Sequence, residues 1–243
     1  MGIFSQNSGF VKFVNRALDV LLLNILWLAF SIPIITIGAS TCAAFSVTLK
    51  MVDDEEGYVA KMFVKAFKEN FKKGTLMWLI SLPWLLLTLA AWRIVAIAQD
   101  YYLLIMIGAI FLTASYIAFN LYAYPLIARY DNSLKNMIKN SLGITLTHFG
   151  KTMLIVILVA LEILIIIFNR YTLFVGILIG PEFIIYTISG ISKRIFQQLD
   201  KQYEAAMKEE KARKELHDET VTAQKIFEEK QNLQNDSEKT DEE

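Results

Sequence analysis

The sequence predicts an all-α membrane protein, a polytopic bundle of about six spans with two cytoplasmic amphipathic helices. The 243 residues are 55% hydrophobic and their mean hydropathy is +0.42, which is higher than in a typical soluble domain. Several apolar stretches also exceed the roughly 18 residues that indicate a membrane span. The single cysteine, Cys42, excludes an intramolecular disulfide and a cysteine metal cluster. We therefore expect the lipid bilayer to surround most of the chain.

The first apolar block runs from Val20 to Leu49 without a charged residue. It is too long for one upright span, and a signature turn of Pro33, Thr36 and Gly38 interrupts it. Basic residues precede and follow the block, so the positive-inside rule places both flanks in the cytoplasm. The block must then cross the membrane twice. A single long tilted helix, which gives five spans and an outer N-terminus, is the alternative.

Four further apolar stretches follow, and each is long enough to cross a hydrocarbon core of about 30 Å. They comprise residues 76–97, 101–127, 152–168 and 171–191. The two short connections between them predict tight outer turns. The longer connections, residues 50–75 and 128–151, are basic and predict the cytoplasmic side. This topology places both termini in the cytoplasm, and we expect the protein in the cell membrane.

Each long connection contains apolar residues at helical spacing, which is typical of an amphipathic helix at the membrane surface. In the first, Phe63 and Phe67 alternate with lysines; in the second, the pattern follows the capping residues Asp131 and Ser133. The two segments form a weak internal repeat of an interfacial helix and a transmembrane hairpin. The functional alternative is a coupling helix that docks on a partner's cytoplasmic domain.

Charge divides the chain into two regions. Lys and Arg outnumber Asp and Glu by 14 to 10 in residues 1–192, and the ratio reverses to 10 to 14 in residues 193–243. We predict a membrane domain over residues 1–207 and a charged, acidic-ended cytoplasmic tail over residues 208–243. The tail is expected to begin as a short helical extension of the last span and to be partly disordered at its end.

Charged residues within the spans are the strongest candidates for a functional site, because a charge at the bilayer centre costs at least about 2.5–3.5 kcal/mol. The candidates are Arg93, Glu162 and Glu182. Glu182 follows Gly180-Pro181, where a helix bends and frees backbone groups. Two interpretations stay open: a buried ion pair between Arg93 and Glu162, and a polar ligand or proton site that involves Glu162 and Glu182.

Motifs of soluble enzymes do not occur in the sequence: it contains no phosphate-binding glycine loop, no nucleophile elbow and no HExxH. The two histidines, His148 and His217, lie in different segments and make a poor metal site. Basic residues lie at membrane boundaries rather than on a separate patch, so we expect no nucleic-acid binding. We therefore expect a non-enzymatic protein without a cofactor or a bound metal.

Two groups of residues resemble the YesL-like family of bacterial integral membrane proteins, a domain of unknown function. They are Asn24-Ile-Leu-Trp27 with Ser31-Ile-Pro-Ile-Ile-Thr-Ile-Gly-Ala-Ser40, and the pattern of Phe63, Phe67, Asn70-Phe71 and Trp78. The resemblance reaches to about residue 205 and leaves out the acidic tail. Members of this family come mostly from Gram-positive bacteria and are often encoded beside carbohydrate ABC transporters and glycoside hydrolases.

The resemblance implies an accessory or regulatory role in carbohydrate ABC transport, with permease subunits of the transporter as partners. It implies no catalytic residues, because none is established in the family. The alternative function is a small secondary transporter or channel. That alternative is motivated by the intramembrane carboxylates of Glu162 and Glu182 and by the interrupted helices, which are common marks of a substrate site.

Overall fold

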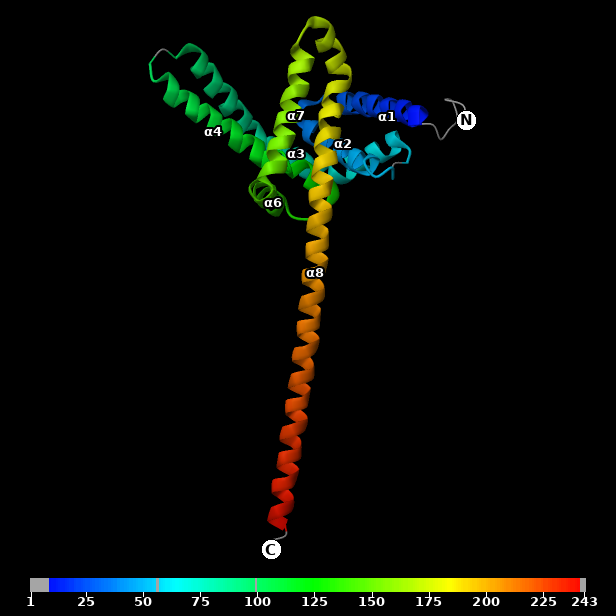
Figure 1. The fold of residues 1–243 in the computed structure, drawn as a ribbon, viewed down its shortest axis with the longest axis vertical. Helices are drawn as coiled ribbons and strands as arrows, with labels where there is room; N and C mark the ends of the chain where they lie inside the picture. Colours follow the sequence, from blue (N-terminus) through cyan, green and yellow to red (C-terminus); the bar gives the residue numbers. More distant parts are fainter. Residues whose placement is uncertain (1–8, 56, 99, 241–243) are drawn as a thin grey trace. The chain divides into compact units, whose positions relative to one another are not determined.

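The structure, a computed structural model, describes residues 9–55, 57–98 and 100–240, and their regular secondary structure is helical (Figure 1). The elements are α1 (Gly9–Phe30), the 3-10 turn η1 (Ile34–Thr36), α2 (Ile37–Met51), α3 (Val59–Ile97), α4 (Tyr102–Asn120), α5 (Ala123–Arg129), α6 (Leu134–Thr147), α7 (Phe149–Ile167) and α8 (Arg170–Thr240). Within the described residues, 6 helical segments are long and apolar enough to cross a membrane. The predicted all-α bundle is confirmed, and the chain is a multi-pass membrane protein.

The chain divides into two compact units, Met1–Lys193 and Arg194–Glu243. The described part of the second unit is the continuation of α8 to Thr240. Residues 194–240 contain no glycine or proline and are rich in strong helix formers, which agrees with a helical extension of the last span. The partly disordered end stays a prediction. Residues 241–243 of the predicted tail lie outside the described residues. The predicted domain boundary at residue 207 stays a prediction.

The first apolar block forms two helices, as the sequence predicted, so the alternative of one long helix is wrong. The chain turns between α1 and α2 through η1, which begins directly after Pro33. The Thr36 hydroxyl donates to the carbonyl oxygens of Phe30 at 2.6 Å and Pro33 at 2.7 Å. Thr36 therefore satisfies a carbonyl that the end of α1 leaves without a helical partner.

We expect Thr36→Val to lower the free energy of unfolding by about 0.5–1.5 kcal/mol, because valine keeps the shape of the side chain and removes the donor. Thr36→Ser keeps the hydroxyl and is expected to cost less. Tryptophan fluorescence during denaturant unfolding in mild detergent compares the two variants. A larger loss for Thr36→Ser than for Thr36→Val would show that packing of the methyl group, rather than the hydrogen bond, holds the turn.

Gly38 differs from its predicted role in the turn: it lies within α2, where this helix crosses α3. A Cβ atom on Gly38 would lie 2.2 Å from the Gly74 carbonyl oxygen and 2.6 Å from the Trp78 Cβ. A Cβ atom on Gly74 would lie 2.8 Å from the Ala39 Cα. The two glycines thus let the backbones of α2 and α3 touch, which is how small residues act in membrane helix pairs.

The first amphipathic segment is continuous with the span that follows it, and together they form α3. Gly74 alone does not end the helix, since α3 contains no proline before Pro83. The aromatic face of this segment packs on the end of α1. The Phe30 ring lies 5.4 Å from the Phe63 ring and 4.9 Å from the Phe67 ring, both in edge-to-face geometry. Protein, and not only lipid, therefore covers this face.

The second amphipathic segment is a separate helix, α6, as predicted. Its Ser133 cap is also confirmed, because the Ser133 hydroxyl accepts the Asn136 N–H at 3.3 Å. Asp131 instead pairs with Lys73 of α3, with its carboxylate oxygen 2.5 Å from the Lys73 Nζ. Hydrogen bonding and the nearby Lys73 charge lower the pKa of this exposed carboxyl below its usual value. The ion pair links α3 to the loop before α6, and so connects the two predicted repeats.

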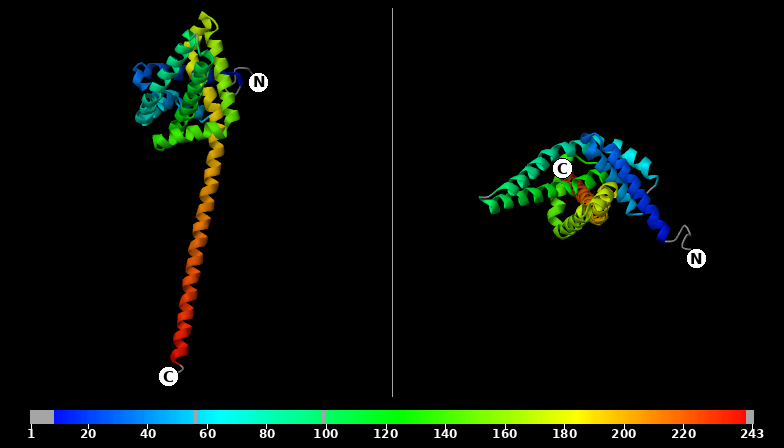
Figure 2. Two further views of the ribbon diagram at one scale, coloured as in Figure 1. Left: turned by 90° about the vertical axis from the view of Figure 1, so that its left-hand side faces the viewer. Right: turned by 90° about the horizontal axis from the view of Figure 1, so that it is seen from above.

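Two antiparallel hairpins form much of the first unit: α3 with α4, and α7 with the beginning of α8 (Figures 1 and 2). The second hairpin turns at Asn169, whose side-chain oxygen accepts the N–H groups of Tyr171 at 2.8 Å and Thr172 at 3.0 Å. This cap explains why two residues suffice for the turn. Along α7 and α8, Gly176 and Gly180 face Ile166, so small residues also allow close packing here.

Candidate functional site

The break between α4 and α5 is the first of two helix interruptions that other helices stabilise. The chain stops donating helical hydrogen bonds near Tyr122, which frees the carbonyl oxygens of Ala118 and Phe119. On α6, the Ser141 hydroxyl donates to these two oxygens at 3.0 Å and 3.2 Å, and Thr145 donates to the Ala118 oxygen at 3.3 Å. Hydroxyl groups of α6 thus replace the missing backbone donors, as membrane helices require.

The second lies at Pro181, where α8 continues as one helix but lacks a backbone hydrogen bond. Proline has no N–H group, so the carbonyl oxygen of Ile177, four residues earlier, loses its helical donor. Asn24 of α1 supplies a replacement: its Nδ2 donates to the carbonyl oxygens of Ile177 at 3.3 Å and Leu178 at 2.7 Å. Its Oδ1 accepts the Glu182 N–H at 3.3 Å. Asn24 therefore anchors α1 to the turn of α8 that contains Pro181.

The sequence-based site candidates did not include Asn24, although an interhelical hydrogen bond was expected of this residue and is confirmed. The available signal was a lone amide side chain in an apolar run, in a chain that has proline within another span. That signal does not identify the partner, because Asn24 and Ile177 are 153 residues apart in the sequence. The side chain is fully buried, which is the condition under which its three hydrogen bonds matter most.

Glu182 is the most unusual of the predicted site residues. Its side chain is 0% exposed, and neither carboxyl oxygen has a hydrogen-bond partner among the described residues. Buried polar side chains nearly always have a partner, so such an exception calls for an explanation. An intramembrane acidic residue of this kind is a candidate functional site by default.

Arg93 and Glu162 are not brought together. The Arg93 side chain is exposed near the end of α3, and no ion pair within the described residues joins it to Glu162. The Glu162 Oε1 accepts the Thr187 hydroxyl of α8 at 2.5 Å, while its Oε2 has no described partner. Glu162 and Glu182 also make no described contact with each other. Each predicted carboxylate therefore lies in its own surroundings.

A buried polar face of α8 extends from Glu182 to Lys193, the last residue of the first unit. We define it by Glu182, Ser189 and Lys193, whose spacings of seven and eleven residues place them on one side of the helix. The Ser189 hydroxyl lies 2.7 Å from the Thr48 hydroxyl of α2. Lys193 forms an ion pair with Asp53 after α2, although the Lys193 side chain is only 4% exposed. Each residue of this face thus contacts α1, α2 or the loop after α2.

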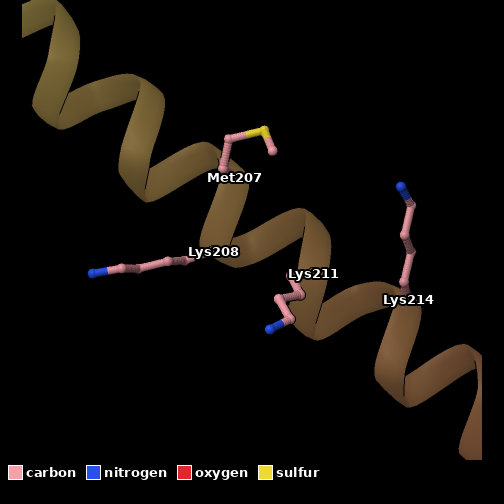
Figure 3. A pocket seen from close by; sticks show the side chains of 4 residues that line it. All are labelled: Met207, Lys208, Lys211 and Lys214. Atoms are coloured by element: carbon pink, nitrogen blue, oxygen red, sulfur yellow. The ribbon is translucent and has the colours of Figure 1, made fainter.

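The second unit offers no comparable site in its described part. A shallow surface region there is lined by Met207, Lys208, Lys211 and Lys214 of one helix (Figure 3). Figure 3 shows these side chains extending in different directions rather than converging on one point. Among the described residues of the whole chain, no group of at least three His, Cys, Asp or Glu side chains is arranged to hold a metal ion.

Comparison with known proteins adds a family match for the segment that contains the α2–α3 crossing. Residues 20–92 match the model of a family described as a protein of unknown function, DUF624. The match is to a family of unknown function. It covers less than a third of the chain and includes Asn24, Gly38 and Gly74. No curated protein and no solved structure matches the chain.

Proposed function

We propose that the chain is a non-enzymatic accessory subunit of a carbohydrate ABC transporter, located in the cell membrane with both termini in the cytoplasm. One observation supports it best: the chain itself leaves most of its membrane surface uncovered. We compare the 18-residue apolar stretch of three candidate spans. The buried share of its residues is 67% in Ile34–Met51, 6% in Tyr102–Arg129 and 11% in Phe149–Ile167. A subunit that packs against other membrane subunits needs such free helix faces.

The resemblance to YesL-like proteins names the partner class, and the positions of the lysines agree with a docking role. Lys61, Lys65, Lys68 and Lys72 are exposed on the cytoplasmic part of α3, opposite the aromatic face that packs on Phe30. Basic residues at this level support a cytoplasmic placement by the positive-inside rule. They also offer a charged surface to a partner at the inner face of the membrane.

Site-specific crosslinking in native membranes tests the accessory role. A photoreactive phenylalanine analogue at Phe111, which is 71% exposed on α4, is expected to crosslink to a permease subunit of a carbohydrate ABC transporter. The same analogue at Ala109, which is 1% exposed on the same helix, serves as the matched control and is expected to give no such adduct. Mass spectrometry identifies the products. Adducts with lipid alone, together with a chain that purifies without permease subunits from mild detergent, would contradict the proposal.

The unpartnered carboxyl of Glu182, next to the proline inside α8, favours a second candidate, a small secondary transporter or channel. Carboxylates in discontinuous spans commonly bind coupling ions or substrates. The purified chain in liposomes separates the two candidates. If the chain alone carries a flux of a sugar or an ion, and Glu182→Gln abolishes that flux, the protein is a transporter or channel rather than an accessory subunit.

A further inference from the structure

Burial and geometry make Glu182 different from every other acidic residue of the described membrane helices. Its carboxyl group is fully buried, and its backbone N–H, but not its side chain, is bonded to Asn24. The matched comparison is Glu162, whose carboxylate accepts the Thr187 hydroxyl at 2.5 Å. A carboxylate buried without a partner is costly, whereas a neutral carboxylic acid is tolerated far better. The described packing of α1, α2 and α8 therefore suits the protonated side chain.

No neighbouring charge compensates for ionisation of Glu182. The titratable and charged groups on α1, α2 and α7 and on the adjoining turns of α8 are Lys12, Arg16, Asp19, Cys42, Lys50, Lys151, Glu162, Tyr186 and Lys193. Within the described residues, none of them makes a hydrogen bond or an ion pair with a Glu182 carboxyl oxygen. Two of these cations already pair with other acids: Arg16 pairs with Asp54, and Lys193 pairs with Asp53.

The polar face of α8 connects Glu182 with Lys193, the last residue of the first unit. Lys193 follows Glu182 by eleven residues, a rise of about 16 Å along the helix. The hydroxyl pair of Ser189 and Thr48 lies between them, at 2.7 Å. Hydroxyl groups and an ion pair on one helix face supply polar partners for water between the buried acid and the surface.

We propose that Glu182 is a proton-binding site that controls the packing of α1 and α2 on α8. The carboxylic acid is protonated in the described packing. When its O–H bond breaks, the proton passes to water along the polar face, and the carboxylate that remains draws water in and loosens the three helices. The reaction is an acid dissociation and needs no further reactant. This function goes beyond the accessory role and does not depend on it.

The thiol of Cys42 reports on this packing, since it is the only cysteine and is fully buried on α2. The full chain in detergent is treated with a small maleimide between about pH 5 and about pH 9, and the labelling rate of the wild type is divided by that of Glu182→Gln at the same pH. This ratio removes the pH dependence of the thiol. We expect this ratio of labelling rates to rise with pH. Below the midpoint of Glu182 ionisation the rise is up to about tenfold per pH unit, because the ionised fraction of the carboxyl group rises by that factor.

Glu162→Gln is the matched control and is expected to keep the wild-type rise. A flat ratio, or a Glu162→Gln variant that removes the rise as well, would overturn the proposal. Replacement of choline chloride by sodium chloride at constant pH tests for a sodium site instead. A change in the Cys42 labelling rate as large as the change caused by pH would overturn proton binding.

A second measurement uses the wild type alone and holds even if Glu182→Gln does not fold. A hydrophobic carbodiimide reacts with a protonated carboxyl in apolar surroundings, and mass spectrometry identifies the labelled peptide. We expect labelling at Glu182 whose rate falls as the pH rises. Labelling that is independent of pH, or labelling of Glu162 in preference to Glu182, would contradict the assignment.

Discussion

Replacement of Gly38 by alanine is expected to lower the free energy of unfolding by about 1–3 kcal/mol or more, the usual cost of an overpacked interior. The new Cβ would lie 2.2 Å from the Gly74 carbonyl oxygen. This oxygen belongs to the main chain and cannot rotate away, so α2 and α3 must move apart. Because α2 is the most covered of the candidate spans, at 67% of its apolar window, the separation disturbs the centre of the bundle.

Two other glycines calibrate this prediction. Gly108→Ala in α4 is the matched control, since its Cβ meets no atom within 4 Å and alanine favours the helix by about 1 kcal/mol. Gly176→Ala is expected to lie between the two, because the atom that it meets at 2.5 Å belongs to the Ile166 side chain rather than to the main chain. Unfolding in mixed micelles, followed by tryptophan fluorescence, ranks the variants. A Gly38→Ala variant as stable as Gly108→Ala would contradict the close contact between the backbones of α2 and α3.

Local features of the sequence predicted most of the fold. Hydropathy and length identify membrane spans without reference to the rest of the chain, and the positions of proline, Thr36 and Ser133 identify a turn and a cap. The continuity of α3 was not predicted. A change from an amphipathic to a uniformly apolar sequence suggests two helices. A helix nevertheless continues through such a change where neither a proline nor a capping residue ends it, as in α3.

Contacts between distant helices were the features that the sequence did not predict. The ion pair of Arg93 with Glu162 assumed that α3 and α7 are neighbours. In the structure α3 packs on α2 and α4, while α7 packs on α6. Gly38 was assigned to a turn because a turn is the commonest local reason for glycine, and its partner Gly74 becomes evident only when α2 lies on α3. Asn24 likewise gains its role from Pro181, which is far away in the sequence.

Asn24→Leu is expected to destabilise the chain by about 1–3 kcal/mol, the cost of leaving a buried polar group without its partner. Leucine has the same branching as asparagine, with bulkier methyl groups, but no donor for the carbonyl oxygens of Ile177 and Leu178 and no acceptor for the Glu182 N–H. Single interhelical hydrogen bonds in membranes contribute about 0.6 kcal/mol on average. The larger value is expected here because Pro181 leaves the Ile177 oxygen without a backbone donor.

A double-mutant cycle with Pro181→Ala isolates this cause. Alanine restores an N–H group at residue 181 that can donate to Ile177, so Asn24→Leu is expected to cost less in the Pro181→Ala chain, with a coupling energy of about 0.5–3 kcal/mol. Asn120→Leu serves as the matched control, because among the described residues the Asn120 Nδ2 donates to Tyr116 of its own helix alone, at 3.0 Å. Its expected cost is below about 1 kcal/mol. If the effects of Asn24→Leu and Pro181→Ala simply add, Asn24 stabilises the bundle through packing. Other groups must then satisfy the Ile177 carbonyl oxygen, which Pro181 leaves without a backbone donor.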